Sequence, residues 1–195
     1  RMPAGESAVR QIGFVIPSVI SEGPFFTMMQ GATDYLSEQG FQLALYNSNR
    51  NETAEREALL RAKEDGCAGV IYYPGPFETG LEVLYHFASI HYPIVVLDKI
   101  IDLVPVTYVV SDNTGGSYQL VKRLIEKGHR RFAFIAMDNV LIQTTRERYL
   151  GCCKAISEAG LTPDNLLLRS PYSGREDMKN EWHDYNNVTI RRLVP

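Results

Sequence analysis

Short runs of apolar, often β-branched residues alternate with amphipathic segments along most of this 195-residue chain. In Val109–Ile135, an apolar run, a polar turn with a glycine pair, an amphipathic stretch, a glycine and a second apolar run follow one another. Continuous apolar runs fit strands covered on both faces, and the amphipathic segments between them fit helices. The alternation therefore predicts an α/β fold built on parallel sheets.

Seven strands are expected at the apolar runs Ile12–Ile16, Phe41–Tyr46, Ala68–Tyr73, Pro93–Asp98, Tyr108–Ser111, Phe132–Ala136 and Leu166–Leu168. The first helix is expected to begin near Pro24, which suits a first turn, and to end before Gly40. Further helices are expected at Asn51–Asp65, Glu78–Ile90, Thr114–Lys127, Thr145–Ala159 and Ser173–Trp182. Helical spacing predicts inward positions for Met28, Met29, Leu59, Leu81, Leu84, Tyr85, Leu120 and Val121.

Composition narrows the classes of protein that this chain can represent. A formal net charge of −3 does not favour a chain whose main task is to grip phosphate backbones. No apolar run approaches the roughly 20 residues that span a bilayer, and Arg1–Arg10 lacks the apolar core of a signal peptide. Cys67, Cys152 and Cys153 lack metal-ligand spacing and are interpreted as thiols in a reducing compartment. These features favour a cytoplasmic protein without membrane attachment.

In open parallel sheets, ligands bind beyond the carboxyl ends of the strands. The segments expected there carry aromatic, amide, carboxylate and arginine side chains: Ser18–Phe26, Asn47–Arg50, Tyr73–Phe77, Asp98–Lys99, Ser111–Asn113 and Asp138–Arg148. No nucleophile–base pair is visible, and no glycine-rich nucleotide motif follows the first expected strand. We therefore expect no enzyme activity, cofactor or metal. The four histidines, expected on helices or at element ends, are interpreted as surface or structural residues: His86, His91, His129 and His183.

This mixture of side chains suits the binding of a small polar molecule. An aromatic ring can stack on the apolar face of a sugar, while carboxylate, amide and guanidinium groups bind its hydroxyls. The pair Gly115-Gly116 has two interpretations, an anion site at a helix N-terminus or, more simply, a tight turn with close helix packing. A small-molecule binding domain is the function that the residues favour.

Several segments, in order along the chain, resemble the effector-binding domain of the lactose-repressor (LacI/GalR) family of bacterial transcriptional regulators. They are IGFVIPSVISEGPFF, GATDYLSEQGFQLALYNSNRN, EREALLRAKEDGCAGVIYYP, YPIVVLDK, VVSDNTGGSYQLVKRLIEKGHRRFAFI and RERYLGCCKAISEAGL. The resemblance implies two Rossmann-like lobes with parallel sheets, a type I periplasmic-binding-protein-like fold. It divides the chain into a linker remnant at 1–10, an N-terminal lobe at 11–128 and a partial C-terminal lobe at 129–195.

The resemblance also implies partners and site residues. It implies a homodimer that binds a small effector, a sugar or a purine-like molecule, in the cleft between the lobes. Operator DNA would be bound only through an N-terminal helix-turn-helix, which is absent from this chain. Arg148, in the R-x-x-G pattern that ends at Gly151, would contact the effector, and a surface salt bridge is the alternative for this residue. Other ligand-binding positions are Thr144, Arg146 and the pair Phe25 and Phe26, of which one would face the cleft and the other the core.

Two other classes of protein remain as alternatives. Periplasmic sugar-binding transport proteins share the fold implied by the resemblance, although their sequences match this pattern less well. An enzyme on a similar doubly wound fold is disfavoured, because a fold alone does not determine function and no catalytic constellation is visible.

Overall fold

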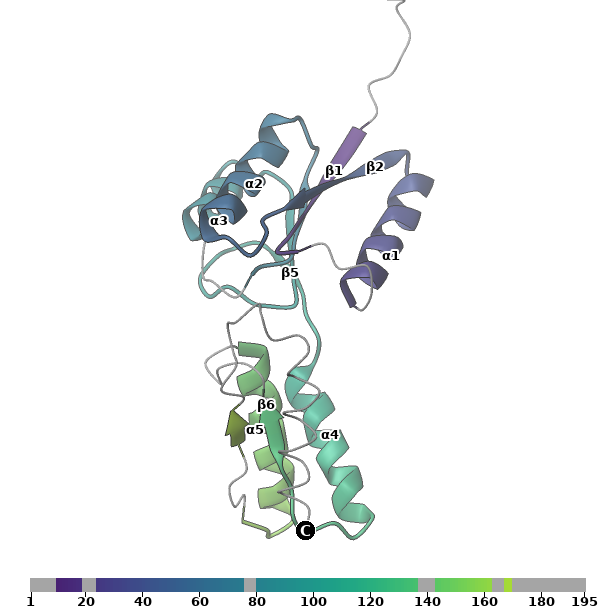
Figure 1. The fold of residues 1–195 in the computed structure, drawn as a ribbon, viewed down its shortest axis with the longest axis vertical. Coiled ribbons are helices and arrows are strands. Elements are labelled where there is room, and N and C mark those ends of the chain that lie inside the picture. Colours follow the sequence, from purple (N-terminus) through teal and green to yellow (C-terminus); the bar gives the residue numbers. More distant parts are fainter. Residues whose placement is uncertain (1–9, 19–23, 76–79, 137–142, 163–166, 170–195) are drawn as a thin grey trace, which may run out of the picture. The chain divides into compact units, whose positions relative to one another are not determined.

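The computed structural model describes residues 10–18, 24–75, 80–136, 143–162 and 167–169 (Figure 1). The chain forms two compact units, Arg1–Ser111 and Asp112–Pro195. The predicted lobe boundary after residue 128 stays a prediction. In the structure, the helix that precedes residue 128 belongs to the second compact unit, where it packs against the next helix.

The first unit is built on a five-stranded parallel sheet, which confirms the α/β prediction. The strand order is β2-β1-β3-β4-β5, so the first strand lies inside the sheet between the second and the third. Parallel neighbours require a crossover between them; helices lie in the connections up to β4, whereas β4 and β5 are joined by residues 98–106 without a helix. The strands are β1 (Arg10–Ile16), β2 (Phe41–Asn47), β3 (Val70–Tyr72), β4 (Ile94–Leu97) and β5 (Thr107–Val109).

Three helices cover this sheet: α1 (Pro24–Glu38) on one face, and α2 (Glu52–Glu64) and α3 (Leu81–Ser89) on the other (Figure 1). The N-terminus of α2 is capped by Asn51, whose side-chain oxygen accepts the Ala54 N–H at 2.9 Å. Acidic residues in the first turn of α2 and basic residues in its last turn complement the helix dipole. The start and end of α2 are therefore set by local sequence.

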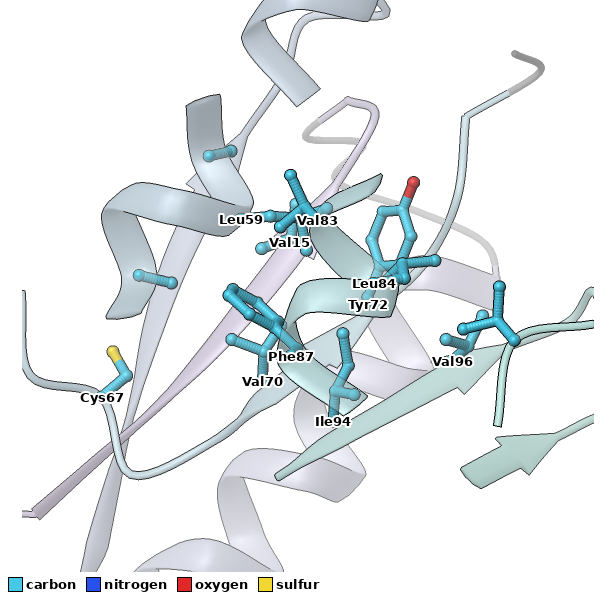
Figure 2. Packing of buried hydrophobic residues seen from close by; sticks show 13 residues of the cluster. Val15, Leu59, Cys67, Val70, Tyr72, Val83, Leu84, Phe87, Ile94 and Val96 are labelled. Atoms are coloured by element: carbon cyan, nitrogen blue, oxygen red, sulfur yellow. The ribbon is translucent and has the colours of Figure 1, made fainter. Parts of the chain in front are cut away.

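The core of the first unit lies between the sheet and the helices α2 and α3 (Figure 2). Val15, Val70 and Tyr72 from the strands pack with Leu59 and Phe87 from the helices. Each of these side chains is at least 98% buried. Burial of this depth contributes roughly 1.5–3 kcal/mol for each large apolar side chain. This packing holds the strand ends in place.

The second unit contains the helices α4 (Asn113–Glu126) and α5 (Gln143–Glu158), with the parallel strands β6 (Phe134–Ala136) and β7 (Leu167–Arg169). The helices meet closely at Gly151, where an added Cβ would collide with the carbonyl oxygen of Thr114. Their apolar contact includes the buried side chains Val121, Ala155 and Ile156. A residue without a side chain therefore permits the close approach of α5 to α4.

The expected elements agree with the structure except at their ends, which shift by up to three residues. Leu59 and Leu84 are fully buried as expected, whereas Met28 and Met29 are half-buried. Three residues expected to point inward, Leu81, Tyr85 and Leu120, are instead 41%, 41% and 64% exposed. Each lies at the margin of an apolar helix face whose central residues are buried, such as Val83 and Leu84 on α3 and Val121 on α4.

The helix expected at Ser173–Trp182 and the segment 1–9 lie outside the described residues. No described helix combines the length and apolar character that a membrane span requires.

Candidate functional site

Arg148, the principal binding residue expected from the sequence, is joined to α4 by a directed hydrogen bond. Its Nε donates to Oδ1 of Asn113 at 2.8 Å. Asn113 is the first residue of α4 and is only 6% exposed. Arg148 is exposed and forms no salt bridge among the described residues, and its role stays a prediction. The guanidinium group is therefore oriented through one nitrogen.

The hydrogen-bond network around Arg148 continues along α5. Nδ2 of Asn113 donates to Oε2 of Glu147 at 3.1 Å, and Nε2 of Gln143 donates to Oε1 of the same carboxylate at 2.8 Å. Both polar ends of the buried Asn113 amide are therefore used, as buried amides require. This network is a second link between α4 and α5, separate from the contact at Gly151. It gives the first turns of α5 a defined polar surface.

The other predicted site residues differ in exposure. Thr144 is buried, at 7% exposure, whereas Arg146 is exposed. Phe26, in the first turn of α1, is 46% exposed. The side chain of Phe25 lies outside the described residues. Their contact with a ligand stays a prediction.

In the first unit, polar side chains meet at the carboxyl ends of β3 and β4. The hydroxyl of Tyr73 donates to Oδ2 of Asp98 at 2.8 Å. Asp98 has a φ of +69°, a left-handed conformation that is uncommon outside glycine. Tyr73, Asp98 and Asn113 lie in strand-end segments that the sequence had marked as candidates, but none was among the predicted site residues. For Tyr73 and Asp98, the position directly after a strand is the signal that could have identified them, whereas Asn113 lies at the start of α4.

The start of α4 resolves the question of Gly115-Gly116. The Gly115 N–H donates to Oδ1 of Asp112 at 2.7 Å, and the Gly116 N–H donates to the Asp112 carbonyl oxygen at 2.9 Å. Both N–H groups are therefore satisfied by the residue that caps the helix. Because that residue is a carboxylate, it also repels anions. These hydrogen bonds leave neither N–H free for an anion, and both glycines lie inside α4; close helix packing is not seen at Gly116, where an added Cβ would meet no atom within 4 Å.

The described residues contain no cluster of three metal-ligating side chains. His86, His91 and His129 are exposed, and His183 lies outside the described residues. The cysteines are free thiols, and burial raises the pKa of Cys152. The arrangement offers directed hydrogen-bond donors and acceptors, which can bind and orient a small polar molecule.

Residues 9–180 match the family described as periplasmic binding proteins and sugar binding domain of LacI family. The chain belongs to this family. The transcriptional regulator RegA of Clostridium saccharobutylicum is 30% identical over 159 residues, which are 82% of this chain and 47% of that protein. The transcriptional repressor PurR of Pasteurella multocida is 29% identical over 181 residues, 88% of this chain and 52% of that protein. The chain thus spans about half the length of these relatives.

Solved structures of LacI-type regulators share the fold. The transcription regulator CcpA of Lactococcus lactis superimposes with a TM-score of 0.72 at 22% identity, over 95% of this chain and 64% of that chain. A periplasmic binding protein/LacI transcriptional regulator from Alkaliphilus metalliredigens, complexed with D-xylulofuranose, gives a TM-score of 0.67 at 23% identity, over 91% and 64%. These matches confirm the periplasmic-binding-protein-like α/β fold expected from the sequence, of which this chain covers part.

Proposed function

We propose that this chain is the effector-sensing and dimerising part of a bacterial LacI-type transcriptional regulator. The effector is a small polar molecule, a sugar or a purine-like compound, and Arg148 is its main contact. The observation that carries this proposal is the hydrogen bond from Arg148 Nε to the buried Asn113, which orients the guanidinium group within a LacI-family domain. A guanidinium held at Nε can direct paired N–H groups at two neighbouring oxygens.

Several relatives support a sugar as the effector. The Ribose operon repressor of Bacillus subtilis is 27% identical over 151 residues, and an arabinose metabolism transcriptional repressor of Geobacillus stearothermophilus is 28% identical over 142 residues. Their names also favour regulation over the transport alternative. We infer that Phe25, Phe26, Thr144 and Arg146 complete the binding site.

The regulator would work by population shift in a homodimer. The effector binds the closed form of the domain better than the open form, and closure changes the spacing of helix-turn-helix heads that bind operator DNA. Because its target is DNA, the protein would act in the cytoplasm. Such assemblies persist at roughly tens of micromolar, so sedimentation of the full-length regulator at this concentration should show a dimer. A monomer alone would contradict the proposed dimerisation.

The experiment that tests the site is a thermal shift of the full-length regulator with D-ribose, L-arabinose and hypoxanthine as probes. We expect at least one probe to stabilise the wild-type protein. Arg148→Lys keeps the positive charge but loses the planar guanidinium group with its paired N–H donors. The variant should therefore remain folded but lose most of the thermal shift that the probe causes. Arg123→Lys, at the exposed end of α4, is the matched control. A full shift in Arg148→Lys would remove Arg148 from the site.

A further inference from the structure

The turn that follows β3 is held from two sides by charged side chains. The N–H of Gly75 donates to Oε1 of Glu55 at 2.9 Å. Nζ of Lys99 donates to the carbonyl oxygens of Gly75 at 2.6 Å and Pro74 at 3.3 Å. The peptide group between Pro74 and Gly75 therefore has its N–H on a carboxylate and its carbonyl oxygen on an ammonium group. Charge-assisted hydrogen bonds of this kind are about twice as strong as neutral ones.

Glu55 reaches this turn from the first turn of α2, where the positive end of the helix dipole favours a carboxylate. Its side chain is buried, at 1% exposure. The hydroxyl of Tyr72, which points away from the apolar core side chains (Figure 2), donates to Oε1 of Glu55. Burial, reinforced by the Glu55 carboxylate, raises the pKa of Tyr72 well above its ordinary value. The phenol therefore stays protonated and remains a donor.

One carboxylate oxygen of Glu55 makes this arrangement costly for stability. Oε2 is buried and has no hydrogen-bond partner among the described residues. An unsatisfied buried polar atom destabilises the folded state, and a charged one does so more strongly. A Cβ added at Gly75 would lie 2.5 Å from this oxygen, so a side chain at position 75 would displace the Glu55 carboxylate from its present position. A residue that served stability alone would more simply be apolar at this buried position of α2.

The next residues along the chain connect this turn to the polar contact between Tyr73 and Asp98 in the same unit. Tyr73, directly after Tyr72, donates to Asp98, and Lys99 follows Asp98. The hydrogen bonds of Glu55 and Lys99 to Pro74 and Gly75 thus hold the residues that follow β3 against the residues that follow β4. Both exits lie at the carboxyl edge of the sheet, where ligands bind in folds of this type.

We propose that Glu55 is a positioning residue for the effector site, which holds the exit turn of β3 in its binding geometry before the effector arrives. This inference rests on the proposed function. Glu55 acts through Gly75 and does not touch the effector. Because the turn is ordered in advance, binding loses less conformational entropy and the affinity is higher.

The first test measures amide hydrogen exchange at Gly75 in the full-length regulator. Glu55→Gln keeps an acceptor oxygen but removes the charge, and Glu55→Met removes both. The Gly75 amide should exchange about tenfold faster in Glu55→Gln, which corresponds to roughly 1.4 kcal/mol, and faster still in Glu55→Met. Glu57→Gln, at an exposed position of α2, is the control and should leave the exchange unchanged. An unchanged Gly75 rate, or an equal acceleration of all amides of β3, would overturn the inference.

The second test measures the affinity for whichever of D-ribose, L-arabinose and hypoxanthine stabilises the wild-type protein, at a temperature where every variant is folded. A positioning role predicts about tenfold weaker binding in Glu55→Met and partial recovery in Glu55→Gln. A residue that served stability alone would lower the melting temperature and leave this affinity unchanged. Wild-type affinity in Glu55→Met therefore counts against positioning. If no probe binds the wild-type protein, the proposed effector class fails, while the Gly75 exchange still decides whether Glu55 holds the turn.

Discussion

The two units of this chain bury their apolar residues to different depths. In the first unit, side chains such as Val15, Leu59 and Phe87 are completely buried between a sheet and two helices. In the described part of the second unit, Val121, Ala155 and Ile156 are 4–7% exposed, and an open pocket of about 890 Å³ is lined by Val121 and Ile156. The comparison indicates that the largest apolar side chains are enclosed more completely in the first unit than in the described part of the second.

The largest effect should follow from a cavity in the better packed unit. Phe87→Ala removes a fully buried ring and should lower the free energy of unfolding of the first unit by about 3–5 kcal/mol. Ile156→Ala, in the second unit, should cost less, near the lower end of the roughly 2–5 kcal/mol range, because its side chain lines an open pocket and is less completely enclosed than that of Phe87. Urea denaturation with hydrogen exchange resolved by unit would measure both. Equal costs would remove the proposed difference in packing.

The next effect concerns the contact between α4 and α5. Gly151→Ala places a Cβ against the Thr114 carbonyl oxygen, so the helices must separate, at an expected cost of about 1–3 kcal/mol. The separation should also break the bond from Arg148 to Asn113. Thermal denaturation and the Arg148 Nε–H resonance in NMR spectra would report the two consequences. Gly116→Ala, where an added Cβ meets no atom within 4 Å, is the control. An unshifted resonance in Gly151→Ala would show that the polar network does not depend on this contact.

The N-cap residues of α2 and α4 allow a matched pair of substitutions, one in each unit. Asn51→Ala and Asp112→Ala each remove a side-chain acceptor from a helix N-terminus and should each cost about 1 kcal/mol. Asp112→Ala should additionally raise amide exchange at Gly115, whose N–H loses its acceptor at the start of the helix that carries Asn113. Exchange rates at Gly115 that match the wild type would contradict this link.

The smallest effect is a difference in thiol reactivity. Cys67, buried in the first unit, should resist alkylation, whereas the half-buried Cys152 should react slowly in a Cys153→Ser background. Burial disfavours the thiolate and raises the pKa of Cys152, so its rate should still be rising above pH 8.5, roughly the ordinary thiol pKa. A pH series of iodoacetamide labelling, read by mass spectrometry, measures the midpoint. A midpoint at or below the ordinary value would contradict the burial described for this side chain.

The strands were predictable from sequence because each is a local apolar run. The assignment of helices to the two units was not predictable in this way. The sequence pattern of the helix that ends near Gly128 shows which face is apolar, but it does not show that α5 packs against that helix. Glu55 was missed for a related reason. A charged residue on a helix is expected in solvent, and only the tertiary contacts with Tyr72 and Gly75 make its burial possible. Arg148 was identified through family resemblance, whereas Asn113, which orients it, required the structure.

The boundary between Tyr72 and Tyr73 has a consequence for how this chain tolerates insertions and deletions. Tyr72 is fully buried, while Tyr73, one residue later, donates its hydroxyl to Asp98 at the strand exit. Because neighbouring side chains on a strand face opposite sides, a one-residue shift in β3 would exchange these roles. A single-residue deletion between Gly66 and Gly69 should therefore damage core and binding surface together. Over evolutionary time, length changes are expected to be excluded from this short segment even where substitutions are accepted.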